Sequence, residues 1–210
     1  MPNPNVASLV AAAQSQPPRC GSTRLILIDG PAGAGKTTLA NRLALALGGA
    51  ASAGAGTFDP ANLLPADAPV QILHGDDMYE GWDGLAGLDE LLLGEVLEPL
   101  SRGEQAGFRM WDWVENRRSH RIDVPPRPYL IVEGVGVAQT AARALASLVV
   151  FVEAPWEVRL QRGVDRDHMA YDDVVERWNV FEAEQNAFLD RHDTRAAADV
   201  ILDGTSPVLE

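Results

Sequence analysis

The chain has 210 residues, 46% of them hydrophobic, and a formal net charge of -13. This length and apolar content predict one domain with a single sizeable core. The acidic charge argues against a nucleic-acid partner, which would need clustered basic side chains, and no apolar run reaches the roughly 18 residues that span a membrane.

The N-terminal residues 1–22 are rich in Ala, Pro, Asn and Ser, and we expect them to form a poorly determined leader before a single domain at residues 23–210. Within this leader, residues 6–13 are a candidate short helix that ends before Pro17 and Pro18. Cys20 is the single cysteine, so no intramolecular disulfide can form. Without a signal-peptide pattern, the chain is expected to be cytoplasmic.

Short aliphatic runs alternate with amphipathic segments along the rest of the chain. The runs predict buried strands at residues 24–29, 70–74, 129–133, 148–152 and 199–202. Helices are predicted at residues 36–47, 88–102, 156–165 and 171–189. Residues 50–69 are dominated by Ala, Gly and Pro and predict an irregular surface loop. The alternation predicts a three-layer α/β fold with about five parallel strands.

A glycine-rich segment lies between the first predicted strand and the helix after it. It matches the pattern G-x-x-x-x-G-K-[ST] and consists of Gly30, Pro31, Ala32, Gly33, Ala34, Gly35, Lys36 and Thr37. Its backbone N–H groups and the helix N-terminus would cradle the phosphates of ATP. Lys36, the only lysine in the chain, would reach the β- and γ-phosphates. Thr37 would bind Mg²⁺, and Thr38 would join the nucleotide-binding residues.

Carboxylates follow three of the predicted strands. Glu133 ends one of them, where it could bind the magnesium ion; Asp29, next to the glycine-rich segment, is the rival for this role. Asp76 and Asp77 follow another strand, where one of them could accept the proton of an attacking hydroxyl. The alternative for Glu133 is an ordinary carboxylate at a strand end, and the alternative for Asp76 and Asp77 is a solvated turn.

Two tryptophans flank an aspartate in the segment formed by Trp111, Asp112 and Trp113. The carboxylate could bind substrate hydroxyls beside a flat apolar wall, although a core pair with a capping acid would give the same pattern. Arg117 and Arg118 follow and could face an anionic group of the substrate or lie in a solvated turn.

Three arginines, Arg159, Arg162 and Arg166, recur at helical spacing and should share one face of a helix. Such a row could form a helical lid whose guanidinium groups close over transferring phosphates. Salt bridges on a solvated face are the alternative. No role is assigned to His74, His120, His168 or His192, because their spacing is not that of metal ligands.

Taken together, these motifs resemble the uridine kinase and phosphoribulokinase-like branch of the P-loop kinases, over residues 25–204. The resemblance implies that Asp76 is the catalytic base and that Tyr79 contacts the substrate. It also implies that Asp112 binds sugar hydroxyls and that Arg118 is the family's final arginine at the acceptor site. The lid arginines are similar to Arg159, Arg162 and Arg166.

The resemblance implies transfer of the γ-phosphoryl group of ATP, with Mg²⁺, to a hydroxyl of a small molecule. Asn116 stands near the position where pyrimidine nucleoside kinases have a base-reading histidine, so we do not expect uridine specificity. A kinase of an unrelated alcohol or acid and a nucleotide-binding regulatory protein remain alternatives. We expect a small-molecule acceptor as partner and neither nucleic acid nor membrane; a homodimer is left open.

Overall fold

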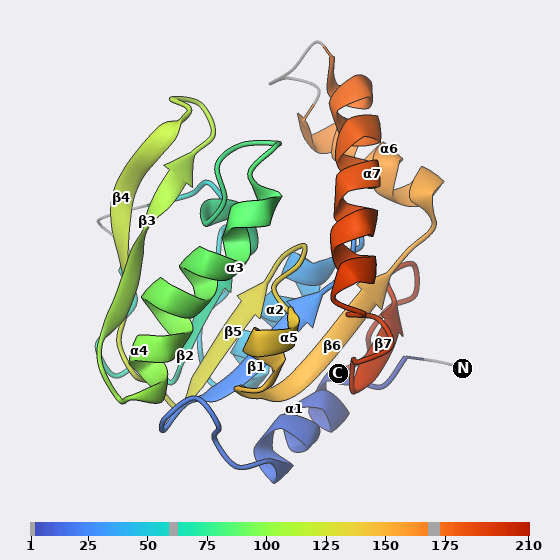
Figure 1. Ribbon diagram of the computed structural model, residues 1–210. Coiled ribbons are helices and arrows are strands. Elements are labelled where there is room, and N and C mark those ends of the chain that lie inside the picture. Colours follow the sequence, from blue (N-terminus) through green and yellow to red (C-terminus); the bar gives the residue numbers. More distant parts are fainter. Residues whose placement is uncertain (1–2, 59–62, 168–172) are drawn as a thin grey trace.

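The computed structural model describes residues 3–58, 63–167 and 173–210 (Figure 1). Its centre is a parallel sheet of five strands in the order β2-β5-β1-β6-β7. The strands are β1 (Arg24–Asp29), β2 (Val70–His74), β5 (Tyr129–Glu133), β6 (Ala146–Glu153) and β7 (Val200–Asp203). The five predicted strands and the parallel sheet are therefore confirmed.

Helices cover both faces of this sheet, which gives the three predicted layers. One face packs on α1 (Val6–Ser15) and α2 (Lys36–Ala46). The other packs on α3 (Leu88–Leu91), α4 (Glu98–Ser101), α5 (Thr140–Arg143) and α7 (Val174–Arg191). A π-helical stretch, Leu92–Leu97, joins α3 to α4, so the predicted helix over this region is one continuous helical segment.

The first helix is part of the core. Val6, Leu9 and Ala13 of α1 are at most 2% exposed and pack against the same apolar cluster as α2. The backbone N–H of Val6 also donates to the carbonyl of Leu209 near the other end of the chain. Residues 6–15 are therefore fastened to the sheet layer.

The sequence prediction missed an antiparallel hairpin, formed by β3 (Ala106–Asp112) and β4 (Arg117–Val124). The pairing register shifts between Arg109 and Trp111, which interrupts the two-residue alternation by which strands are recognised. Only Val124 of β4 is buried, so this strand lacks an apolar face as well. Asn116, at the turn, has a φ of 50°, a left-handed conformation that asparagine tolerates well.

Two helices stand beside the carboxyl edge of the sheet (Figure 1), α6 (Trp156–Asp167) and α7. They pack closely because Gly163 has no side chain where the ring of Trp178 lies; a Cβ there would come within 2.0 Å of the ring. The predicted start of the second helix at Tyr171, and His168, lie outside the described residues. No helix in the described part of the chain is long and apolar enough to cross a membrane.

Candidate active site

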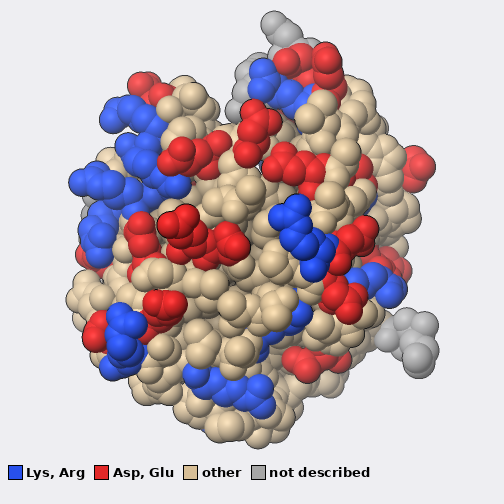
Figure 2. Space-filling model, viewed as in Figure 1, with Lys and Arg blue, Asp and Glu red and all other residues tan. Residues whose placement is uncertain are grey.

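A cavity of about 620 Å³ opens at the carboxyl edge of the sheet. Its walls come from the glycine-rich loop, from the segments after β2 and β5, from loop residues 53–56, and from α6 and α7. In Figure 2 the surface is notched between the hairpin β3–β4 and these two helices. The sheet therefore brings segments that are distant in the sequence to one site.

The glycine-rich loop, which joins β1 to α2, depends on backbone shapes that only glycine adopts easily. Gly30 has a φ of 135°, and a Cβ there would come within 2.1 Å of the Val152 carbonyl oxygen. The Nζ of Lys36 donates to the carbonyls of Gly30 and Pro31, at 2.8 and 2.9 Å. Burial lowers the pKa of Lys36, although nearby Glu133, Asp76 and Asp29 oppose the shift. Lys36 and Thr37 both line the cavity.

The alternation of side chains along the strands decides whether Glu133 or Asp29 contacts Thr37. Glu133 lies in register with Ile28 of β1, and the side chains of this row face α2; its Oε1 accepts a hydrogen bond from Thr37 Oγ1 at 3.0 Å. Asp29 is one residue further along β1 and so faces the opposite side. Its carboxylate accepts N–H bonds from Gly30, Gly136 and Ala138. Glu133 is therefore placed beside Thr37, whereas Asp29 holds the backbone of the segments after β1 and β5 in place.

His74, to which the sequence assigned no role, contacts the same glutamate. It pairs with Glu133 in the parallel register, and its Nδ1 lies 2.5 Å from Glu133 Oε1. Burial alone would lower the pKa of His74, but the Glu133 carboxylate raises it overall. Burial would likewise raise the pKa of Glu133, but the hydrogen bonds from His74 and Thr37 and the charge of Lys36 lower it. Glu133 is thus held as a carboxylate.

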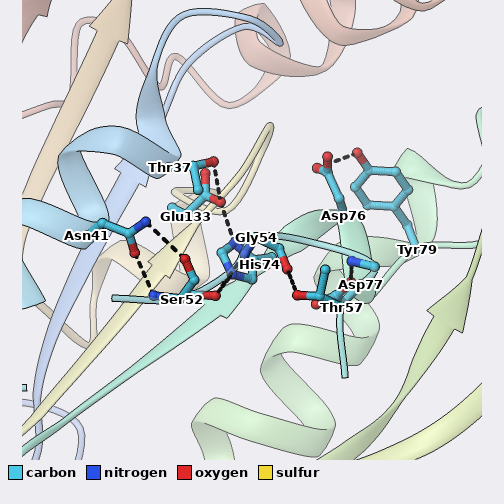
Figure 3. Close-up of polar contacts among 11 residues, drawn as sticks. Thr37, Asn41, Ser52, Gly54, Thr57, His74, Asp76, Asp77, Tyr79 and Glu133 are labelled. Atoms are coloured by element: carbon cyan, nitrogen blue, oxygen red, sulfur yellow. Dashed lines mark hydrogen bonds and ion pairs between the residues drawn. The ribbon is translucent and has the colours of Figure 1, made fainter. Parts of the chain in front are cut away.

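The two adjacent aspartates after β2 point to different partners (Figure 3). Asp76 lines the cavity, and its Oδ1 accepts a hydrogen bond from the hydroxyl of Tyr79 at 2.8 Å. Burial raises the pKa of Tyr79 well above its ordinary value, so this phenol remains a donor. Asp77 is buried, and its Oδ1 accepts the N–H of Gly56 at 2.6 Å. Burial raises the pKa of Asp77 to about 7.

Aromatic rings line the side of the cavity next to Asp76. The rings of Tyr79, Trp82, Trp113 and Phe181 meet edge to face, with centroids 5.7 to 6.1 Å apart. The Trp113 indole N–H also donates to the Asp76 carbonyl at 3.0 Å. All four side chains face the cavity. We call them the aromatic wall.

The predicted substrate ligands of the hairpin lie elsewhere. Trp111 is 7% exposed and packs under the Arg118 guanidinium, and neither residue lines the cavity. Asp112 Oδ1 accepts the N–H groups of Val114 and Glu115, which caps the hairpin turn. Trp113, and not Trp111, is the tryptophan of this segment at the cavity. The substrate roles of Trp111, Asp112 and Arg118 have no support from this geometry.

The basic side chains of the hairpin also point away from the cavity. Arg118 donates to Glu80 Oε1 at 3.1 Å, and Arg117 is largely exposed, 4.0 Å from Glu115. Figure 2 shows arginines gathered over this hairpin, on the outer surface of the molecule. Neither arginine is placed to read an anionic group inside the cavity.

The three arginines of α6 divide into two kinds. Arg162 and Arg166 line the cavity, and Arg162 donates to the carbonyls of Gly33 and Gly204, both at 3.0 Å. Arg159 is 4% exposed and forms a two-bond ion pair with Glu182 of α7, at 2.6 and 2.8 Å. Arg159 therefore joins the two helices, in contrast to the predicted row of three cavity-facing side chains.

A second cavity, of about 340 Å³, lies on the other side of the glycine-rich loop. The two cavities share Gly35, Thr38 and Arg162 as lining residues. The end of β7 and the chain after it form much of its remaining wall, through Leu202, Asp203, Gly204, Ser206, Pro207 and Val208. A ligand with phosphates on the loop could extend into this space.

Several lining residues had no sequence signal of their own. Trp178 and Phe181 read as ordinary apolar positions of a helix, and loop residues 53–56 belong to a stretch without periodicity. His74 ends a predicted buried strand, as Glu133 does. Residues paired in register on neighbouring parallel strands face the same side of the sheet, so His74 could have been found if β2 and β5 had been known to be neighbours. Among the described residues, no group of three or more His, Cys, Asp and Glu side chains forms a metal site.

Comparisons with known proteins identify the family of the chain and structures that share its fold. The model of the family "Phosphoribulokinase / Uridine kinase" matches residues 25–208. A candidate uridine kinase from Bacillus stearothermophilus superposes with a TM-score of 0.61 at 18% identity, covering 94% of this chain and 97% of that one. A candidate fructose transport system kinase from Silicibacter sp. TM1040 gives 0.59 at 20% identity, covering 94% and 98%. No curated protein matches the sequence.

Proposed function

The chain belongs to the phosphoribulokinase / uridine kinase family, and from this premise we propose that it transfers the γ-phosphoryl group of ATP to a hydroxyl of a small molecule. One observation carries the proposal: the Thr37–Glu133 pair, the Asp76–Tyr79 pair and the lid arginines Arg162 and Arg166 line one cavity. These are the parts that phosphoryl transfer needs around the reacting phosphate.

The loop at residues 30–38 would bind the phosphates of ATP, and the second cavity would take its nucleoside part. A hydroxyl and a carboxylate in contact, Thr37 and Glu133, are suitable oxygen donors for Mg²⁺, directly or through water. The ion would neutralise charge on the β- and γ-phosphates. Lys36 would turn from the carbonyls of Gly30 and Pro31 to the phosphates.

At the acceptor, Asp76 would take the proton of the attacking hydroxyl, with Tyr79 holding one carboxylate oxygen by its hydrogen bond. Arg162 and Arg166 would stabilise negative charge on the transferring group. The aromatic wall favours an acceptor with a flat or apolar ring next to its hydroxyl. Since Arg117 and Arg118 lie outside the cavity, a recognition site for an acidic acceptor has less support.

The test is a measurement of ADP release with ATP and Mg²⁺ against a panel of ring-bearing and acyclic metabolites that carry hydroxyls. We expect acceptor-dependent ADP release with a ring-bearing member, and release at least about 100-fold slower from Asp76→Asn with the same acceptor. Tight ATP binding without ADP release for every acceptor would favour the nucleotide-binding regulatory protein instead.

A further inference from the structure

A chain of hydrogen bonds joins the metal side of the site to a loop on the acceptor side (Figure 3). Glu133 Oε1 lies 3.0 Å from Thr37 Oγ1 and 2.5 Å from His74 Nδ1. On the far side of the imidazole ring, His74 Nε2 lies 2.7 Å from the hydroxyl oxygen of Ser52. His74 and Glu133 are each 5% exposed, so water competes little for these bonds.

The direction of these bonds follows from their chemistry. An ionised carboxylate can only accept, so Nδ1 of His74 carries the proton and donates to Glu133. Ser52 Oγ accepts the N–H of Gly54 at 3.1 Å, and it can also accept Nε2–H of the charged ring or donate its own proton to Nε2 of the neutral ring. Every polar atom of the His74 ring therefore has a partner.

The loop that Ser52 begins is fastened at two more places. The side chain of Asn41, on α2, bonds both the N–H and the carbonyl of Ser52, at 2.8 and 3.1 Å. Asp77 accepts the N–H of Gly56. Between these anchors, residues 53–56 line the cavity. Within the segment predicted as an irregular surface loop, residues 53–56 thus form part of the wall of the site.

We infer that His74 is a positioning residue, which holds the Glu133 carboxylate beside Thr37 and links it to the loop at residues 52–57. The inference rests on the proposed function, in which Glu133 and Thr37 face the magnesium ion. Residues that hydrogen-bond a metal-binding carboxylate fix its orientation, and their loss typically weakens metal affinity about 10- to 100-fold. His74 occupies that place here, because Glu133 Oε1 accepts from it and from Thr37.

Two conservative substitutions separate the two bonds of the ring. In His74→Asn the amide nitrogen is bonded to Cγ, as Nδ1 is, so the bond to Glu133 can be kept while the Ser52 contact is lost. In His74→Gln the amide lies one bond further out, near the place of Nε2, so the Ser52 contact can be kept while the Glu133 bond is lost. His74→Ala removes both, and His192→Ala, on a histidine outside the cavity, is the matched control.

The experiment is a calorimetric titration of a non-hydrolysable ATP analogue at a series of Mg²⁺ concentrations and in EDTA. We expect His74→Ala and His74→Gln to raise the Mg²⁺ concentration needed for half-maximal enhancement of binding about 10- to 100-fold. His74→Asn and His192→Ala should stay within a few-fold of the wild type, and binding in EDTA should be the same for all. Should His74→Ala fail to fold, the comparison of Asn with Gln decides.

The inference is overturned if His74→Asn and His74→Gln have the same Mg²⁺ dependence, or if His74→Ala has that of the wild type. Glu133→Gln and Thr37→Ala separate this failure from a failure of the proposed function. If these two variants also leave the Mg²⁺ dependence unchanged, the proposed metal site itself is wrong. If they shift it and the His74 variants do not, only the role of His74 is wrong.

Discussion

The two halves of the cavity are built in different ways. The nucleotide half consists of the loop at residues 30–38 with Glu133, Arg162 and Arg166, and most of its lining residues belong to one contiguous segment that follows β1. The acceptor half consists of Asp76, the aromatic wall and loop residues 52–57, which come from four separate parts of the chain. In the proposed function, the first half would bind and activate the nucleotide, and the second would select the molecule that receives the phosphate.

The largest expected effect is the loss of kcat on substitution of Asp76, where the two halves meet. We expect Asp76→Asn to lower kcat about 10²- to 10⁴-fold, because the acceptor hydroxyl loses its general base. Affinity for an ATP analogue should change little, since the nucleotide half is intact. The measurement is ADP release under saturating acceptor, beside calorimetry of the analogue. A larger loss of turnover in Asp77→Asn than in Asp76→Asn would reverse the assignment of the base.

A second test compares two arginines of the same helix. Arg159→Ala deletes a guanidinium that is only 5% exposed and takes the ion-pair partner from Glu182, which keeps its bonds to Gln185 and Asn186, so we expect the free energy of unfolding to fall by about 3 kcal/mol. Arg166→Ala deletes a guanidinium that is 62% exposed, and Asp167 keeps the N–H of Trp178, so we expect a fall of about 1 kcal/mol or less together with a lower kcat. Urea denaturation and ADP release measure the two effects. Equal stability losses would contradict the division between them.

Asp77 predicts a pH dependence of stability in the acceptor half. Burial raises its pKa in the folded state to about 7, well above the ordinary pKa of an aspartate, so the folded state keeps this proton to higher pH than the unfolded state. The contribution of Asp77 to stability is therefore highest at low pH. It falls as the pH rises above the ordinary pKa of an aspartate and through 7, by about 2–3 kcal/mol between pH 5 and pH 8.

Asp77→Asn keeps an oxygen for the N–H of Gly56 and removes the titration. We expect this variant to gain stability relative to the wild type as the pH rises from 5 to 8, measured by urea denaturation at both values. A constant difference between the two proteins would show that Asp77 does not titrate in this window.

The smallest effect concerns the aromatic wall. Trp82→Leu removes edge-to-face contacts with Trp113 and Phe181, so we expect KM for a ring-bearing acceptor to rise about 2- to 10-fold while KM for ATP is unchanged. Trp156→Leu is the matched control, because Trp156 packs on Arg159 outside the cavity. An increase in KM for ATP in Trp82→Leu would place Trp82 in the nucleotide half.

The sequence predicted the nucleotide half far better than the acceptor half. The parallel strands and the glycine-rich loop have local signals, namely aliphatic runs and a fixed motif, and Glu133 follows from its place at a strand end. Trp113 could not be distinguished from Trp111, because Trp113 lies past the end of β3, where strand alternation no longer says which way a side chain points. Arg159 shares helical spacing with Arg162, but its partner Glu182 lies on another helix, which spacing cannot reveal.

Transfer of the label from γ-labelled ATP tests the central claim most directly. With Mg²⁺ and an acceptor, we expect one labelled phosphate on the acceptor for each ADP formed, and Asp76→Asn should slow this transfer about 10²- to 10⁴-fold. Label released as inorganic phosphate at the same rate with and without acceptor would contradict the account, because the two halves of the cavity would then not serve one phosphoryl transfer.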